Sequence, residues 1–285
     1  MALLEIKEIA ARDAGAIDEL VSRAFQYQSP HHFLEDFPIW GTDRALRLGI
    51  YEQSQLVSHV GIRFCEMQTS RGLERIALMG AVATHEQHRG KGLSTTLLRE
   101  AIQRVEARSC PWSILWGSEH EFYGRLGFKL EGTQARALIS DLAINTAGLQ
   151  SSPVKVGLTD SIFQDFLRRK TGIQFTEADR SWFFSHPTVE WHYLDEPFSY
   201  VAYQRGMDLK HMVHEMGGDL RGIQKILYHI YLQCPIAQVM GQTDDLIKLG
   251  FPMKAIFEEN LCLARPTFAG EKWKPEYWIS GLSAC

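Results

Sequence analysis

The residues best suited to chemistry form a glycine-containing segment, residues 87–94, between an apolar and an amphipathic stretch. Gly90 and Gly92 carry no side chains, so the backbone can approach a ligand and direct successive N–H groups at it. The amphipathic stretch follows directly, and a helix N-terminus adds partial positive charge. Arg89 and Lys91 add two cations at the rim. This segment is therefore expected to bind an anion, and a diphosphate suits it best.

Two common phosphate-binding loops do not fit this segment. A Walker loop needs a glycine five residues before its Gly-Lys pair and a serine or threonine after that pair. The chain has His85 and Gly92 at those places. The dinucleotide fingerprint needs a third glycine where the chain has Thr95. Both alternatives lose the residues that make them specific.

Apolar spacing predicts the elements that would position the segment. Strands are expected over 46–52 and 56–69, and a third strand ends near Thr84. A helical spacing runs from 93 to 105, and a short apolar strand follows at 112–116. The glycines would therefore join a strand to a helix.

The segment resembles the donor loop of the GNAT superfamily of N-acetyltransferases, which reads Gln/Arg-x-x-Gly-x-Gly/Ala after the fourth strand. Gln87, Gly90 and Gly92 match it. The stretch SEHEFYGRLGF at 118–128 is similar to the family's second landmark, a tyrosine followed four residues later by Gly-Phe. The resemblance covers roughly residues 4 to 140. It implies an α/β fold of the mixed-sheet (α+β) kind.

The resemblance also implies a reaction, the transfer of an acetyl group from acetyl-CoA to a primary amine. Tyr123 would protonate, or hydrogen-bond to, the leaving thiolate, and the N–H of Val82 would stabilise the oxyanion. The amine would attack the acetyl carbonyl directly, so positioning would dominate catalysis. The expected cofactor-binding residues, which meet pantetheine or pyrophosphate, are Val82, Ala83, Thr84, Gln87, His88, Arg89, Gly90, Lys91, Gly92, Leu93 and Ser94.

The general base is left open by the sequence. The strand before the donor loop, Ile76 to Thr84, contains no carboxylate. The alternatives are a chain of waters or one of Glu66, His85, Glu119 and His120. The acceptor is expected against the loop after the first helix, whose aromatic and acidic side chains suit a cation. These side chains are Tyr27, His31, His32, Phe33, Glu35, Asp36 and Trp40.

The second half of the chain echoes the first. LIKLGF at 246–251 repeats the pattern of YGRLGF at 123–128, after a strand and a polar turn. A linker is expected over 145–153, so that a catalytic domain (1–145) precedes a degenerate GNAT-like domain (150–285). The copy is called degenerate because Leu246 replaces Tyr123, and because Glu215 and Asp219 would repel a diphosphate.

A tandem arrangement is similar to the enhanced-intracellular-survival branch of aminoglycoside acetyltransferases. Residues 191–197, WHYLDEP, resemble a turn of that branch's second module. The branch has a third, sterol-carrier-like domain whose terminal carboxylate is the proposed base. The sequence ends at Cys285, so that domain is expected to be missing, and the aminoglycoside specificity is not carried over.

Composition favours a cytoplasmic protein. The chain has 285 residues, a formal charge of −4 and 45% hydrophobic residues. Five scattered cysteines predict neither disulfides nor a metal site, and no segment is apolar enough for a signal or a membrane span. Neither nucleic acid nor membrane is expected as a partner, and a homo-oligomer is left open. The alternatives to amine acetylation are a non-catalytic acetyl-CoA sensor, a longer acyl donor, and a peptide or protein amine.

Overall fold

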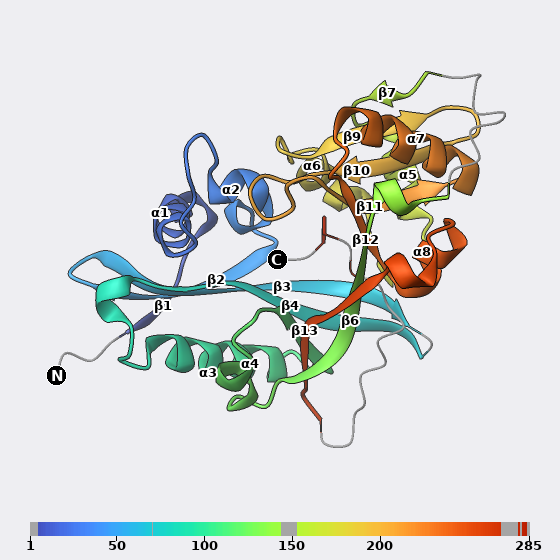
Figure 1. The fold of residues 1–285 in the computed structure, drawn as a ribbon. Coiled ribbons are helices and arrows are strands. Elements are labelled where there is room, and N and C mark those ends of the chain that lie inside the picture. Colours follow the sequence, from blue (N-terminus) through green and yellow to red (C-terminus); the bar gives the residue numbers. More distant parts are fainter. Residues whose placement is uncertain (1–4, 70, 144–152, 269–278, 280, 284–285) are drawn as a thin grey trace.

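The computed structural model describes residues 5–69, 71–143, 153–268, 279 and 281–283. Its centre is a single 13-stranded sheet (Figure 1). The first half supplies β1 (Ile6–Glu8), β2 (Ala45–Glu52), β3 (Gln55–Thr69), β4 (Gly72–Thr84), β5 (Trp112–Trp116) and β6 (Lys129–Leu138). The second half supplies β7 (Lys155–Val156), β8 (Gly172–Ile173), β9 (Glu190–Leu194), β10 (Ser199–Tyr203), β11 (Met212–Gly218), β12 (Gln238–Gly241) and β13 (Phe257–Pro266).

The strand order is β1-β2-β3-β4-β5-β13-β6-β12-β11-β10-β9-β7, and β8 pairs with β3 beside this path. Most neighbours are antiparallel, whereas β4–β5 and β11–β12 are parallel. The predicted mixed α/β fold is thereby confirmed. The strands expected at 46–52, 56–69 and 112–116 are present to within one residue.

Helices cover both faces of the first half's sheet (Figure 1). On one face lie α1 (Gly15–Ala24) and α2 (Phe33–Asp36); on the other lie α3 (Leu93–Glu106) and α4 (His120–Gly124). Helix α3 forms over the predicted residues because its apolar side chains recur every three or four positions. Leu97, Leu98, Ala101 and Val105 are fully buried against the strands. This packing fixes the helix N-terminus at the end of β4.

The second half repeats the order of the first. Its helices are α5 (Asp160–Leu167), α6 (Arg180–Phe183), α7 (Leu220–Gln233) and α8 (Thr243–Lys248). The series β2-β3-β4-α3-β5-α4-β6 recurs as β9-β10-β11-α7-β12-α8-β13. Tyr123 and Leu246 occupy equivalent places, because the N–H of Phe128 donates to Tyr123 O (3.2 Å) and that of Phe251 to Leu246 O (3.1 Å).

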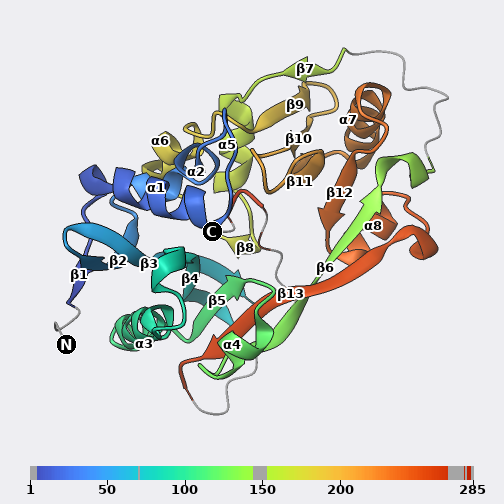
Figure 2. The same ribbon diagram turned by 60° about the vertical axis from the view of Figure 1, so that its left-hand side comes forward.

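The two halves exchange their last strands. β13 of the second half lies between β5 and β6, and β6 of the first half pairs with β12. Figure 2 shows β6 and β13 running side by side from one half to the other. Leu263 of β13 is opposite Leu115 of β5, and both side chains are buried. Backbone hydrogen bonds therefore connect the halves, and the predicted linker at 145–153 lies almost wholly outside the described residues.

An aromatic core also joins the halves. Phe166, Phe183 and Trp191 of the second half belong to the same apolar cluster as the buried face of α1. The ring centroids of Phe166 and Phe183 are 4.7 Å apart. The Arg63 guanidinium of β3 lies 4.3 Å from the centroid of the Trp182 ring. The aromatic cluster of the second half thus forms part of the core between the two halves.

Candidate active site

A cavity opens where β4 and β5 separate. The two strands pair only from Ile76 to Leu78 on β4. Beyond that point the register of β4 against β3 shifts, and Ala81 adopts a φ of +52°. Such a bulge bends the strand and increases its twist. The result is a cavity of about 1170 Å³ that is lined by both strands.

The donor loop follows at the end of β4. Gly90 and Gly92 have φ values of +75° and +78°, a region that favours glycine. A Cβ atom at either position would meet nothing within 4 Å, so the space beside this backbone is open. Gly92 is the N-cap of α3, and no side chain caps the helix. The first-turn N–H groups are therefore left without a side-chain acceptor, as an anion site requires.

The polar residues around this loop hold it against β4. The Thr84 hydroxyl lies 2.6 Å from the Ser94 hydroxyl, and Arg89 Nε donates to Thr84 O at 3.2 Å. His85 is buried, and its Nδ1 accepts the N–H of Gln87. Of these residues Arg89 also lines the cavity. Remaining members of the expected set lie where β4 ends (Val82, Ala83), in the loop (His88, Lys91) and at the start of α3 (Leu93).

Tyr123 lies on α4 at the wall of the cavity. Its side chain is 9% exposed, and Phe122 and Phe128 pack edge-on against its ring. Burial and the neighbouring carboxylate of Glu119 raise the pKa of Tyr123 to about 12. The phenol therefore keeps its proton at any pH near neutrality.

The four candidates for the general base lie in different parts of the structure. Glu66 lies on β3 at the end remote from the donor loop, where its carboxylate is 4.0 Å from Arg75. His85 lines a different, smaller pocket beside α1. His120 is absent from the residues that line the large cavity, and its Nε2 has no hydrogen-bond partner among the described residues. Glu119 alone among the four lines the cavity together with Tyr123.

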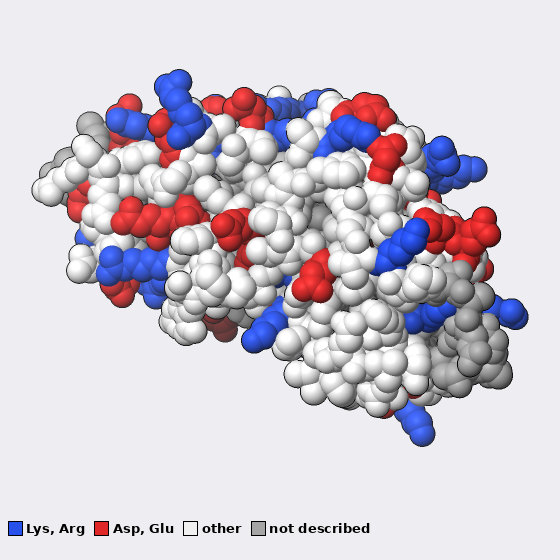
Figure 3. Space-filling model, turned by 90° about the horizontal axis from the view of Figure 1, so that it is seen from above, with Lys and Arg blue, Asp and Glu red and all other residues white. Residues whose placement is uncertain are grey.

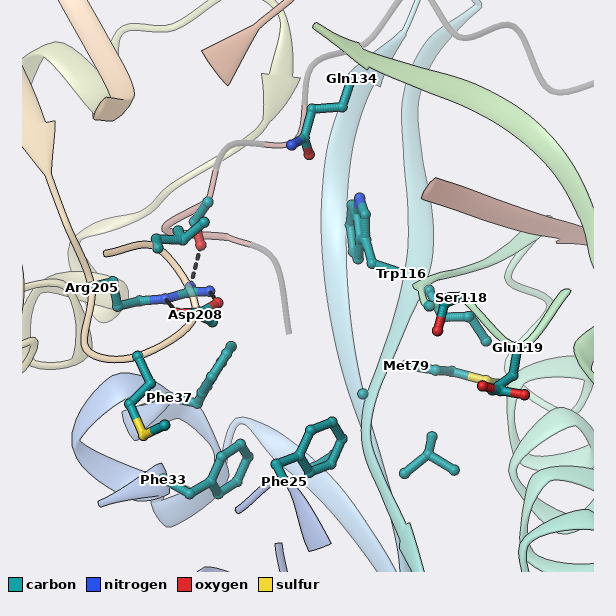
Figure 4. Close-up of a pocket in the computed structure, with 18 of the residues that line it drawn as sticks. Phe25, Phe33, Phe37, Met79, Trp116, Ser118, Glu119, Gln134, Arg205 and Asp208 are labelled. Carbon is teal, nitrogen blue, oxygen red and sulfur yellow. Dashed lines mark hydrogen bonds and ion pairs between the residues drawn. The ribbon is translucent and has the colours of Figure 1, made fainter. Parts of the chain in front are cut away.

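The rest of the cavity lining combines aromatic side chains of the first half with thioether side chains of both halves (Figure 4). Of the predicted acceptor residues, Tyr27 and Phe33 line the cavity, whereas Asp36 and Trp40 are fully buried behind it. His31, His32 and Glu35 lie outside the lining. The sequence did not indicate the other apolar lining residues, namely Phe25, Phe37, Met79, Trp116, Met207, Met212, Met240 and Ile279.

A loop of the second half completes this wall. Arg205 lies 4.1 Å from the centroid of the Phe37 ring, and its guanidinium pairs with Asp208 (Nη2–Oδ2 2.5 Å). It also donates to the carbonyl of Gly281. Asp36 accepts the N–H of Met207 at 3.1 Å. The cavity is thus built by both halves, and the Arg205 charge is neutralised by a carboxylate.

In the second half, the position equivalent to the donor loop is occupied by the side chain of Asp219. Only Asp219 separates β11 from α7, where the first half has a loop of eight residues from 85 to 92. Asp219 Oδ1 accepts the N–H groups of Arg221 (2.9 Å) and Gly222 (3.0 Å). The helix N-terminus that would hold a phosphate is therefore occupied by a carboxylate.

Replacing Gly92 by valine should weaken the binding of acetyl-CoA strongly. A β-branched residue is strained at a φ of +78° and places a side chain in the open space beside the first turn of α3. Isothermal titration of folded protein measures the effect, with Gly15→Val in α1 as a control for a glycine of ordinary φ. Unchanged affinity in Gly92→Val would exclude the loop as the diphosphate site.

Among the described residues, no group of His, Cys, Asp or Glu could hold a metal ion. In the same part of the chain, every helix is too short or too polar to cross a membrane.

Comparison with known proteins agrees with this geometry. Residues 5–130 match the family model of the acetyltransferase (GNAT) domain. No curated protein matches the sequence. A GCN5-related N-acetyltransferase from Anabaena variabilis is 14% identical, with a TM-score of 0.67 over 93% of this chain and 73% of its own.

Two further solved structures share the fold. Eis1 from Mycobacterium abscessus is 14% identical, with a TM-score of 0.60 over 93% of this chain and 74% of its own. A putative acetyltransferase from Pyrococcus horikoshii is 13% identical, with a TM-score of 0.61 over 100% of this chain and 97% of its own. These likenesses support the expected resemblance to the enhanced-intracellular-survival branch at the level of the fold. The family match thus covers residues 5–130 with the acetyltransferase (GNAT) domain model, and the solved structures show that the chain shares their fold.

Proposed function

We propose that the protein transfers an acetyl group from acetyl-CoA to a primary amine of a small molecule. The observation that carries this proposal is the meeting of three features at one cavity: the open donor loop, the diverging edges of β4 and β5, and the buried phenol of Tyr123. The first suits a diphosphate, the second an extended amide chain, and the third a departing thiolate.

The chain's own residues have defined tasks in this reaction. The N–H groups at the start of α3 hold the diphosphate, and the N–H of Val82 donates a hydrogen bond to the acetyl oxygen as that oxygen gains negative charge. The uncharged amine nitrogen bonds to the acetyl carbon, the carbon–sulfur bond breaks, and the thiolate leaves. The nitrogen gives its surplus proton to solvent, which leaves the neutral amide. A phenol with a pKa of about 12 holds its proton more tightly than a thiol near 8.5. Tyr123 therefore serves as a hydrogen-bond donor to the thiolate and does not give up its proton. The proton that converts the thiolate to a thiol comes from solvent.

The cavity favours an amine that carries an apolar or aromatic body. Its acceptor side presents aromatic rings and thioethers, and two of its arginines are paired: Arg205 with Asp208, and Arg136 with Glu259. Glu119 lines the cavity without a salt bridge to any described residue. One unpaired carboxylate suits one ammonium group, whereas a polycation such as an aminoglycoside needs more. In Figure 3 basic and acidic side chains are interspersed on the upper face, so this face has no strong field of one sign.

A thiol-release screen tests the proposal. Acetyl-CoA is offered with 2-phenylethylamine, tryptamine, spermidine, kanamycin and a lysine peptide, and products are identified by mass spectrometry. We expect release with the arylalkylamines and little with kanamycin. If the protein binds acetyl-CoA but no amine causes release of free CoA thiol, it is a non-catalytic sensor and not an enzyme. If only the peptide causes thiol release, the acceptor is a peptide or protein amine.

We expect one acetyl-CoA per chain. The donor site of the second half is capped by Asp219, and Leu246 replaces the phenol. Isothermal titration gives the stoichiometry, and Gly92→Val should abolish the one binding event. Two equivalents, or binding that survives Gly92→Val, would assign a donor site to the second half.

A further inference from the structure

A buried histidine lies behind the bulge of β4. The side chain of His59, on β3, is fully buried and has the Trp40 ring edge-on at 6.4 Å. Its Nδ1 is 2.8 Å from the carbonyl oxygen of Ala81. A carbonyl can only accept, so Nδ1 carries the proton and donates. Burial lowers the pKa of His59 to about 4, which keeps the ring neutral with Nδ1 as its donor.

This hydrogen bond fixes one peptide group of the bulge. The bond between Ala81 and Val82 is trans, so its C=O and N–H point in opposite directions. The carbonyl of Ala81 points toward β3, where His59 lies. The N–H of Val82 must therefore point to the other edge of β4, which faces the cavity between β4 and β5.

Neighbouring contacts agree with this direction. The N–H of His85 donates to Val57 O, and Ser58 donates to Ala83 O, so residues 83 and 85 present their backbone groups to β3. Backbone groups alternate along a strand, so those of residues 82 and 84 face away from β3. Thr84 O accordingly accepts from Arg89, whose side chain lines the cavity.

We propose that His59 is a positioning residue for the acetyl transfer: its bond to Ala81 O orients the peptide whose N–H, at Val82, stabilises the oxyanion. The inference rests on the proposed function. A donor in an oxyanion site helps only if it is held in place before charge develops. Ala81 has an unfavourable φ of +52°, and the bond from His59 opposes rotation of this peptide into another conformation. The same bond polarises the peptide and strengthens the N–H as a donor.

Two substitutions of similar shape separate donation from packing. His59→Asn places an amide nitrogen near the position of Nδ1, whereas His59→Leu has the same branching and no donor. The assay is steady-state acetylation of 2-phenylethylamine, or of the best amine in the screen, with acetyl-CoA affinity measured by titration and folding by thermal denaturation.

For His59→Leu we expect kcat to fall roughly 10- to 100-fold, with acetyl-CoA affinity changed less than about threefold. His59→Asn should recover most of kcat. Three outcomes would overturn the positioning role of His59: an equal loss of kcat in both variants, an unchanged kcat in His59→Leu, or a raised KM with no change in kcat. If His59→Leu does not fold, His59→Asn decides alone, and a loss above about tenfold in folded protein rejects the proposal. Failure of the proposed function would instead appear as no thiol release by the unsubstituted protein.

Discussion

Tyr123→Phe is expected to lower kcat roughly 10- to 1,000-fold while the affinity for acetyl-CoA barely changes. The substitution keeps the ring between Phe122 and Phe128 and removes only the hydroxyl, which we propose donates to the departing thiolate. The lost interaction exists mainly in the transition state, so binding of the ground state should be spared. Steady-state kinetics and titration with acetyl-CoA measure the two quantities.

Tyr228→Phe on α7 is a matched control, because it removes a phenol hydroxyl remote from the cavity. An unchanged kcat with a raised KM in Tyr123→Phe would make Tyr123 a substrate-positioning residue. The pKa of Tyr123 adds a second test. Because the neutral phenol is the active form, activity due to Tyr123 is lost only as pH rises through about 12. If activity already falls with rising pH below pH 9, that loss must be assigned to the titration of another group.

Ending the chain at residue 145 is expected to yield insoluble protein. The truncation removes β13 from between β5 and β6, so that β5 keeps only β4 as a neighbour and β6 loses both of its partners, β13 and β12. It also uncovers buried side chains such as Leu115, each contributing about 1.5–3 kcal/mol when fully buried. Unpaired apolar edge strands promote aggregation. Solubility and circular dichroism of residues 1–145 provide the measurement.

Co-expression of residues 1–145 and 150–285 as separate chains is the matched control. The exchanged strands need no covalent link, so we expect the fragments to co-purify as a soluble complex that binds acetyl-CoA. A folded fragment 1–145 that binds acetyl-CoA alone would show that the first half is stable without the exchanged strand.

Local patterns predicted the parts of the fold that depend on local chemistry. Helix α3 and the donor loop were predictable because apolar spacing and the two glycines determine them within about 15 residues. Residues 191–194 were interpreted as part of a turn but lie in β9, where Trp191 and Leu194 are buried in two different apolar clusters. Gly250, with a φ of +101°, follows α8, and β13 starts only at Phe257.

The parts of the site that depend on distant contacts could not be predicted. His59 occurs within an ordinary strand sequence, and only the register with β4 brings it to the carbonyl of Ala81. Arg205 and Asp208 reach the cavity from the second half because the exchanged strands set the two halves side by side. The sequence of β13 carries no information on which strands it pairs with.

The exchange of β6 and β13 also bears on the ancestry of the chain. A symmetric pair of one-module chains could make the same reciprocal exchange, each giving its last strand to the other through an isologous contact. Joining two copies of such a gene end to end would preserve every contact and hold the copies at equal abundance. One copy could then lose its donor loop without loss of the shared architecture. Asp219 at one helix N-terminus and the open glycines at the other are what such divergence would leave.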